Sequence, residues 1–199
     1  CMESGHDLTE GGAKYNGIGP QASGIATCAD SLSSIKQLVF EEKVCTGAEL
    51  LQALKDNWVG HEKLHALVNS SKVHHYGNDD DYADELFKFM FETYCKHIAG
   101  RKTPRGGTFS PGVYSVNANV AMGLNTNASA DGRCRGEAIS DNMGPVHTDM
   151  GSHDINGPTA IVNSLAKVDH SLATNGTLMN LRFPQEAVAG IEGRDNLAG

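Results

Sequence analysis

The stretch at residues 76–98 reads YGNDDDYADELFKFMFETYCKHI, a turn followed by an acidic cluster and a long helical pattern. The acidic residues lie where the dipole of a helix favours negative charge, at its N-terminus. Apolar or semi-apolar side chains then recur at helical spacing and mark one face: Tyr82, Leu86, Phe89, Met90 and Thr93. We therefore predict a helix that ends near Gly100 and buries this face.

Three shorter helices are predicted on the N-terminal side of this stretch. Residues 30–42 carry apolar residues at helical spacing, and Asp30 or Ser31 is expected to cap the start. Residues 46–49 form a capping box of the T-x-x-E type, which predicts a helix from there to about residue 57. A third helix is expected over residues 61–68.

The pattern changes on the C-terminal side, beyond Pro104. Residues 114–122 alternate between apolar and polar side chains, which is typical of a strand. Residues 123–157 are rich in Gly, Asn, Asp and Ser, and so long a loop is usually functional or tied down by a larger body. A helix over residues 163–172 and a short strand over residues 178–183, closed by Pro184, complete a mixed α/β chain.

Charge and composition exclude some classes of protein. The 199 residues carry 16 Lys and Arg against 24 Asp and Glu, a net charge of −8. Nucleic acids and anionic membranes are recognised by clustered cations, which this chain lacks, so we expect neither partner. No apolar run approaches the roughly 18 residues of a membrane span and no leader opens the chain, which makes cytoplasmic the expected location.

The cysteines and the first residue give two further expectations. The five cysteines are odd in number and form no C-x-x-C pair, which fits free thiols in a reducing compartment. The chain starts at Cys1 rather than at Met, so we interpret it as an internal fragment.

One motif allows a zinc-peptidase alternative. His61, Glu62 and His65 satisfy H-E-x-x-H, which on a helix places two imidazoles one turn apart and a carboxylate beside them. The context is unfavourable, because Lys63 lies between the histidines and no third ligand follows at the usual spacing. An exposed amphipathic helix face is the competing interpretation.

A second motif suggests a nucleotide site. Residues 17–22 read GIGPQA and match the G-x-G-x-x-A fingerprint of dinucleotide-binding folds. A buried strand should precede such glycines, yet Lys14, Tyr15 and Asn16 stand there. The alternative is a turn whose glycines adopt positive φ.

Beyond these motifs, ten blocks in collinear order resemble the glycyl radical enzymes, the pyruvate formate-lyase-like family of anaerobic enzymes. The blocks are residues 7–16 (DLTEGGAKYN), 19–21 (GPQ), 29–32 (ADSL), 38–43 (LVFEEK), 76–80 (YGNDD), 104–107 (PRGG), 111–115 (PGVYS), 131–133 (DGR), 156–160 (NGPTA) and 174–178 (TNGTL). Together they span nearly the whole chain.

The resemblance implies a fold and a chemistry. It implies that residues 1–199 are part of one ten-stranded α/β barrel domain that encloses a dry pocket, usually in a homodimer. A glycine radical, installed by a separate radical-SAM activating enzyme, passes to a cysteine thiyl and then to a small-molecule substrate. Such chemistry requires exclusion of water and close contact between the reacting groups. No bound cofactor and no metal are expected beside the protein radical.

The same resemblance places the radical residues outside this chain. The family's catalytic cysteine, often followed by x-Glu-Pro, lies far upstream of a G-G-A-x-Y-N block, whereas Cys1 is only ten residues before Gly11. The pairing of Cys1 with Glu3 is then accidental. The radical glycine belongs to an R-V-x-G-[YF] signature that does not occur at residues 182–199. We therefore expect no catalytic residue within the chain, and no turnover by the chain alone.

What the chain is expected to supply is part of the substrate pocket. In several relatives the P-G-x-Y block lines that pocket, so Tyr114 is the first candidate, with Ser115 and Asn117 as the alternative face of the predicted strand. Residues 156–160 and 175–178 resemble the dehydratase, amine-lyase and decarboxylase branches. Cleavage of a C–O, C–N or C–C bond is the expected reaction, and formate C-acetyl transfer is the alternative within the family.

Overall fold

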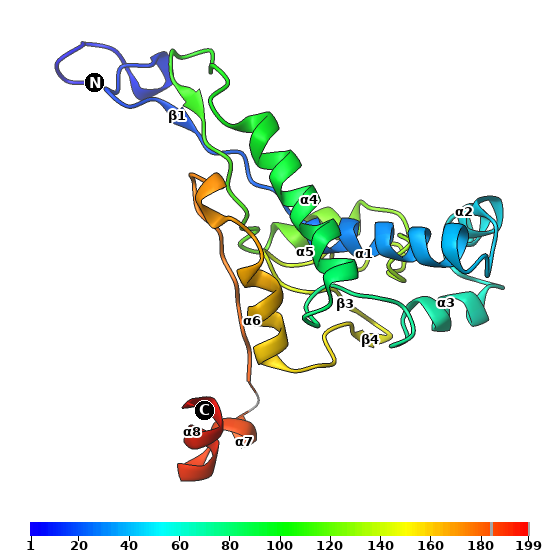
Figure 1. The fold of residues 1–199 in the computed structure, drawn as a ribbon. Coiled ribbons are helices and arrows are strands. Elements are labelled where there is room, and N and C mark those ends of the chain that lie inside the picture. Colours follow the sequence, from blue (N-terminus) through cyan, green and yellow to red (C-terminus); the bar gives the residue numbers. More distant parts are fainter. Residues whose placement is uncertain (184, 199) are drawn as a thin grey trace.

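A computed structural model describes residues 1–183 and 185–198 and shows a mainly helical body with an extended N-terminal arm (Figure 1). Its α-helices are α1 Ile25–Ile35, α2 Gly47–Lys55, α3 Glu62–Val68, α4 Asp81–Ile98, α5 Ala118–Leu124, α6 Pro158–Ala166, α7 Gln185–Val188 and α8 Gly190–Ala198. A π-helical turn, η2 Lys36–Glu41, continues α1, and 3-10 turns occur at η1 Leu8–Glu10 and η3 His170–Leu172.

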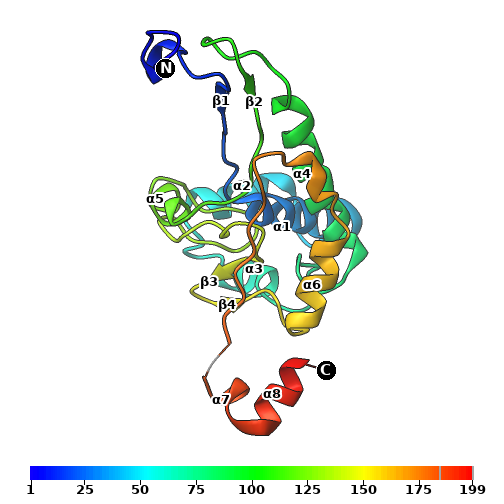
Figure 2. The same cartoon turned by 90° about the vertical axis from the view of Figure 1, so that its left-hand side faces the viewer.

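Strands are few in the described ranges. In the arm, β1 Gly17–Ile18 pairs in parallel with β2 Thr108–Phe109, and β3 His147–Thr148 pairs antiparallel with β4 Gly151–Ser152 (Figure 2). These two small sheets and the helices agree with a mixed α/β class. The ten-stranded barrel of the whole domain stays a prediction.

Helices α2, α3 and α4 begin and end close to the predicted positions. Thr46 Oγ1 accepts from the Glu49 amide at 3.2 Å and Glu49 Oε2 accepts from the Thr46 amide at 2.7 Å, so the capping box of α2 is confirmed. At α4, the Asp80 carboxylate accepts from the Tyr82 amide at 3.0 Å. Local hydrogen bonds of this kind are readable from sequence because both partners lie within one turn.

The prediction that Asp30 or Ser31 caps the first helix is wrong. α1 already begins at Ile25, so both residues lie inside it. The Asp30 side chain is fully buried, and its Oδ1 accepts from the amide of Tyr76 at 2.8 Å. The Asp30 carboxylate therefore binds the backbone of the distant loop at Tyr76 and does not cap a helix.

The main hydrophobic core lies between α1 and α4, which cross in the centre of the body (Figure 1). The ring of Phe87 stacks on Tyr76 with centroids 3.8 Å apart and planes at 5°. The residues of α4 that are most buried form a stripe with a spacing of four: Ala83, Phe87, Phe91 and Cys95. The buried face of α4 is therefore rotated by part of a turn from the predicted one. Phe87, which stacks on Tyr76, is buried, whereas Phe89 is 59% exposed.

A second core packs α2 and α3 beneath η2. Trp58 lies in the turn between α2 and α3 with a positive φ of 66°; it is buried and donates its indole N–H to the carbonyl of Arg133 at 3.3 Å. Leu38, Leu50 and Val68 pack around it. The loop that follows α5 is thereby attached to the helical half of the chain.

The strand predicted over residues 114–122 is not formed. Val116 adopts a positive φ of 57°, and α5 begins two residues later at Ala118. The apolar side chains whose alternation suggested a buried strand face are exposed instead: Val116, Val120 and Met122. Ser115 and Asn119 are the buried residues of this stretch, and the side-chain amide of Asn119 donates to the Ile139 carbonyl at 3.3 Å. The alternation therefore reflected no sheet.

The long loop after α5 is tied down, as expected for its length. Arg133 is fully buried, and its guanidinium donates to Ser129 Oγ at 3.1 Å and to the carbonyls of Cys134 and Glu137 at 3.0 and 2.8 Å, as well as to the Asn127 carbonyl. The Arg133 side chain thus holds residues 127–137 together by hydrogen bonds. Because each carbonyl accepts from a cation, the loop needs no regular secondary structure there.

The C-terminal elements differ in part from prediction. α6 begins at Pro158, five residues before the predicted start, because Gly157 and Pro158 supply a helix N-terminus. Residues 178–183 are extended but form no ladder, so the predicted strand is wrong; the expected stop at Pro184 falls outside the described residues. No helix in the described part of the chain has both the length and the apolar composition to cross a bilayer.

Candidate functional site

Tyr114 lies at a junction between two extended segments. The amide of Val113 donates to the carbonyl of Gly176 at 2.9 Å, and the Val113 carbonyl accepts from the Leu178 amide at 3.1 Å. This pairing sets the Tyr114 ring beside Asn175, whose side-chain Nδ2 donates to the Tyr114 hydroxyl at 3.2 Å. Because the hydroxyl oxygen accepts this bond, its own proton stays available to another acceptor.

The Asn175 side chain is itself held by close packing. A Cβ added at Gly19 would lie 2.1 Å from Asn175 Nδ2, so only glycine permits the amide to sit there. The Asn175 backbone N–H donates to the Pro111 carbonyl at 2.9 Å. Gly19 and Gly17 belong to the G-x-G-x-x-A match, yet neither has a positive φ and Gly17 is in β1. The turn predicted there is wrong, and close approach is what requires Gly19.

The structure does not bring Ser115 to Tyr114's side. The Ser115 hydroxyl is buried and donates to Asp141 Oδ1, while its amide donates to Asn142 Oδ1 at 2.6 Å. Asn117 is exposed at the start of α5 and lines a groove of about 410 Å³ that Arg182 also lines. The three predicted pocket residues therefore occupy three different environments.

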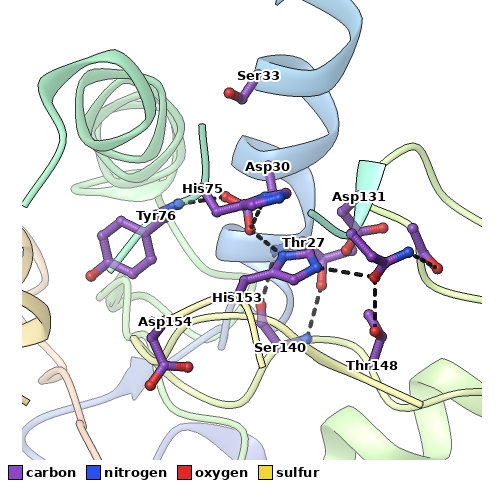
Figure 3. Close-up of polar contacts among 12 residues, drawn as sticks. Thr27, Asp30, Ser33, His75, Tyr76, Asp131, Ser140, Thr148, His153 and Asp154 are labelled. Carbon is purple, nitrogen blue, oxygen red and sulfur yellow. Dashed lines mark hydrogen bonds and ion pairs between the residues drawn. The ribbon is translucent and has the colours of Figure 1, made fainter. Parts of the chain in front are cut away.

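A second polar site is fully internal and is built from three distant segments (Figure 3). Asp30 comes from the middle of α1, His75 from the loop before α4, and His153 from the residue after β4. Their exposed fractions are 0%, 4% and 3%. Asp30 Oδ2 lies 3.0 Å from His153 Nδ1 and 3.4 Å from His75 Nδ1. The two imidazole rings stack with centroids 3.8 Å apart.

The electrostatics of this internal site are unusual. Burial alone raises the pKa of a carboxyl group, but the attraction of His153 and then of His75 outweighs this effect, so the pKa of Asp30 is lowered. Asp131, equally buried nearby, shows the opposite result: burial raises its pKa, which the hydrogen bond from Ser129 only partly offsets. The site therefore keeps its negative charge on Asp30.

The histidines of the H-E-x-x-H motif do not meet at a common point. His61 Nε2 lies 3.3 Å from Asp56 Oδ2, whereas His65 Nε2 lies 2.6 Å from the Gly132 carbonyl and its ring stacks on Trp58. Each imidazole is committed to a different structural partner. The zinc-peptidase alternative thus loses its geometric basis.

Residues 1–123 match the family model described as pyruvate formate lyase-like, and residues 143–199 match the one described as glycine radical. Both matches define a class of enzymes that use a protein-based radical. The chain belongs to the pyruvate formate lyase-like family of glycyl radical enzymes.

Several similar proteins within this family are dehydratases. The chain is 84% identical over 197 residues to (2S)-3-sulfopropanediol dehydratase of Klebsiella oxytoca, covering 99% of this chain and 24% of the relative. It is 41% identical to trans-4-hydroxy-L-proline dehydratase of Clostridioides difficile, covering 100% of this chain and 24% of that protein. The glycerol-bound form of the B12-independent glycerol dehydratase from Clostridium butyricum superposes with a TM-score of 0.87 at 38% identity, over 100% of this chain and 24% of that one.

These relatives are dehydratases, and the chain spans about a quarter of their length. The predicted family and its enzymatic nature are confirmed. The position of the radical cysteine and glycine outside these residues stays a prediction, as do the activating enzyme and the homodimer.

Sequence reasoning missed the internal Asp30, His75 and His153 site. The residues are far apart in sequence, since Asp30 and His153 are separated by 123 positions, and no spacing rule joins them. The available signal was weak: His75 directly precedes the YGNDD block, and Asp30 lies in the ADSL block. Nothing in these two blocks of the family resemblance pairs the side chains of Asp30 and His75.

Proposed function

We propose that this chain is part of a glycyl radical dehydratase that removes water from (2S)-3-sulfopropanediol. The single observation that carries the proposal is the 84% identity over 99% of the chain to a dehydratase of that name. Identity to the hydroxyproline enzyme is only half as high, at 41%. Loss of water from a 1,2-diol gives an aldehyde, so the product is a three-carbon aldehyde that retains the sulfonate.

The radical chemistry is proposed to come from residues outside this chain. A glycine radical, made by a separate radical-SAM activating enzyme and passed through a cysteine thiyl, would abstract a hydrogen atom from the substrate. The part described here contributes a wall of the pocket. Such a wall must exclude water and hold the substrate against the reacting groups.

Within this wall we assign the substrate contact to Tyr114. Its hydroxyl accepts from Asn175 Nδ2, which orients the oxygen and leaves its proton to donate to a substrate oxygen. A hydrogen bond to the departing hydroxyl group would stabilise it as it leaves. Ser115 is already bonded to Asp141, so it supports the turn behind Tyr114, and Asn117 stays a candidate on the adjacent groove.

The reaction is tested with the full-length protein and its activating enzyme under anaerobic conditions. Aldehyde formation is followed by coupled reduction, and the glycine radical by electron paramagnetic resonance. We expect the (2S) diol sulfonate to be consumed at least about tenfold faster than the (2R) form, glycerol or trans-4-hydroxy-L-proline. Faster turnover of glycerol or hydroxyproline, in a sample that contains the radical, would contradict the assigned substrate.

Tyr114→Phe tests the pocket assignment. It removes one hydroxyl group and keeps the ring, so kcat should fall by about 10²-fold while the radical yield and the melting temperature are retained. Asn175→Ala should give a smaller loss, and the double variant should be no worse than Tyr114→Phe, because Asn175 acts through that hydroxyl. Additive losses in the double variant, or an unchanged rate for Tyr114→Phe, would remove this role.

A further inference from the structure

The two histidines of the internal site have their outer ring nitrogens fixed by acceptors. His75 Nε2 lies 2.9 Å from the Val68 carbonyl, and His153 Nε2 lies 3.3 Å from Asn69 Oδ1. The Asn69 amide is oriented by its Nδ2, which donates to the His65 carbonyl at 3.0 Å. Since these oxygens only accept, both Nε2 atoms carry the ring proton.

The inner nitrogens face one carboxylate oxygen. Asp30 Oδ2 and the two Nδ1 atoms all lie within 4.8 Å of one another, and His75 Nδ1 makes no hydrogen bond although its side chain is 4% exposed. The other Asp30 oxygen is occupied by the Tyr76 amide at 2.8 Å. An unpartnered imidazole nitrogen is thus aimed at a buried anion.

A cation at the centre satisfies all three groups. If both rings were neutral, two nitrogen lone pairs would point at a carboxylate, which is repulsive. If both were protonated, two cations would stack with centroids 3.8 Å apart in a buried site. If only His153 were protonated, it would donate to Asp30 Oδ2 at 3.0 Å, but His75 Nδ1 would keep a buried lone pair without a donor. One divalent ion bound to both Nδ1 atoms and to Oδ2 leaves no such atom.

The separations from Asp30 Oδ2 to the two imidazole nitrogens fit such an ion. Zinc bonds to imidazole and carboxylate are about 2.0–2.1 Å, so adjacent ligand atoms of a tetrahedral site lie about 3.3 Å apart. The separations of 3.0 and 3.4 Å between Asp30 Oδ2 and the two nitrogens bracket this value. The outer hydrogen bonds, from each Nε2 to a carbonyl or amide oxygen, are also the usual support of a metal-bound histidine.

We propose that Asp30, His75 and His153 bind a divalent transition-metal ion of the Zn²⁺ type (Figure 3). A cavity of about 120 Å³ lies beside the site and is lined by His75, His153 and Asn78. The ion joins α1 to two loops, and Asp30 and His153 are 123 residues apart in sequence. Its role is structural, separate from the Tyr114 pocket.

The site is tested on the full-length protein in its non-activated form. The protein is treated with a chelator, exchanged into metal-free buffer and titrated with Co²⁺ and with Zn²⁺, with metal content measured by mass spectrometry. We expect one equivalent per chain that is absent from His75→Gln and His153→Gln, whose affinity falls at least about 100-fold. His61→Gln is the control, because it removes a histidine that pairs with Asp56 away from the site, and it should bind the metal normally.

Each outcome decides the proposal. Zn²⁺ should raise the melting temperature of the wild type and not that of His153→Gln. If the variants fail to fold, X-ray absorption at the zinc edge of the wild type must show scattering from two imidazoles and an oxygen ligand. Equal metal content in wild type and variants, a loss confined to His61→Gln, or a spectrum without imidazole would overturn the site.

Discussion

Two clusters near α4 each contain a buried carboxylate, and they differ in the groups that face it. At the N-terminus of α4, Lys167 lies within 2.9, 2.7 and 2.8 Å of carboxylate oxygens of Asp79, Asp81 and Asp84. At the internal site, Asp30 faces two imidazoles whose outer nitrogens are already used. The first cluster contains a lysine, which carries a positive charge at neutral pH. Among the residues that the structure describes, the second contains only histidines beside its carboxylate, and a histidine can be neutral.

The contrast shows how to separate a structural ion cluster from a binding site. In the lysine cluster, Ser164 Oγ and Lys167 Nζ both donate to Asp84 Oδ2, at 2.9 and 2.8 Å. The side chain of Lys167 is also 24% exposed. Water can therefore solvate part of the charge in the lysine cluster. In the described part of the chain, each cluster holds one buried atom without a hydrogen-bond partner, Asp84 Oδ1 in the first and His75 Nδ1 in the second, but the internal site is closed to solvent and has no lysine or arginine beside its carboxylate.

Asp30→Asn should have the largest effect on stability. The substitution keeps the shape and the acceptor for the Tyr76 amide but removes a fully buried charge that both imidazoles face. We expect the opening free energy of the segment around Tyr76 to fall by about 3–5 kcal/mol. Hydrogen–deuterium exchange of the full-length protein measures this.

Asp149→Asn is the control for that experiment, because Asp149 is exposed in the loop between β3 and β4. It should leave the exchange rate of the same segment unchanged. Equal protection in the Asp30 variant and in this control would mean that the buried carboxylate contributes little, and the contrast between the two clusters would lose its basis.

Lys167→Met should have an intermediate effect. The variant keeps the aliphatic stem and leaves the buried Asp84 with Ser164 as its remaining side-chain partner. A hydrogen bond to a charged group contributes about 1.5–3 kcal/mol, and we expect a loss of that size in the local stability of α6. Lys88→Met, which removes a lysine paired only with Glu85 on the surface of α4, should have almost no effect.

The cost of Lys167→Met should shrink as the pH falls. Hydrogen bonds from Lys167 and then Asn163 lower the pKa of Asp79 below its ordinary value near 4. A carboxyl group with a lowered pKa stabilises the fold above its unfolded pKa, and this contribution is lost as the pH falls through the folded pKa. The difference between wild type and variant should therefore be largest near pH 7, begin to shrink at about pH 4 and be smallest below the lowered pKa of Asp79. A difference that is constant with pH would show that packing of the lysine stem, and not its charge, accounts for the effect.

The sequence predicted what depends on neighbours within a turn. The capping box at Thr46, the helix over α4 and the short helix α3 follow from patterns in which cause and effect are adjacent. The resemblance of ten collinear blocks predicted the family, because many weak matches in one order are jointly specific.

What could not be predicted depends on contacts between distant segments. The sequence predicted that Asp30 caps a helix, but its carboxylate instead pairs with the Tyr76 amide and with His153. The alternation at residues 114–122 suggested a strand, but a strand needs a partner, and the backbone turns at Val116. Gly19 looked like a turn residue, although its reason is the amide of Asn175 beside it. Each error assigned a local cause to a residue whose partner lies far along the chain.

Thr46→Ala should give the smallest effect and sets the scale for the others. Both capping bonds are local and exposed, and the Glu49 pKa is lowered mainly by the Thr46 backbone N–H and then by its hydroxyl. We expect the opening free energy of α2 to fall by about 1 kcal/mol, with no change at α4 or near Tyr76. Thr46→Ser keeps the hydroxyl and should restore most of the protection. If the loss spread to the buried Asp30 region, the local cap and the distant cluster would form one cooperative unit, and the ranking of effects proposed for the two clusters would have to be redrawn around that unit.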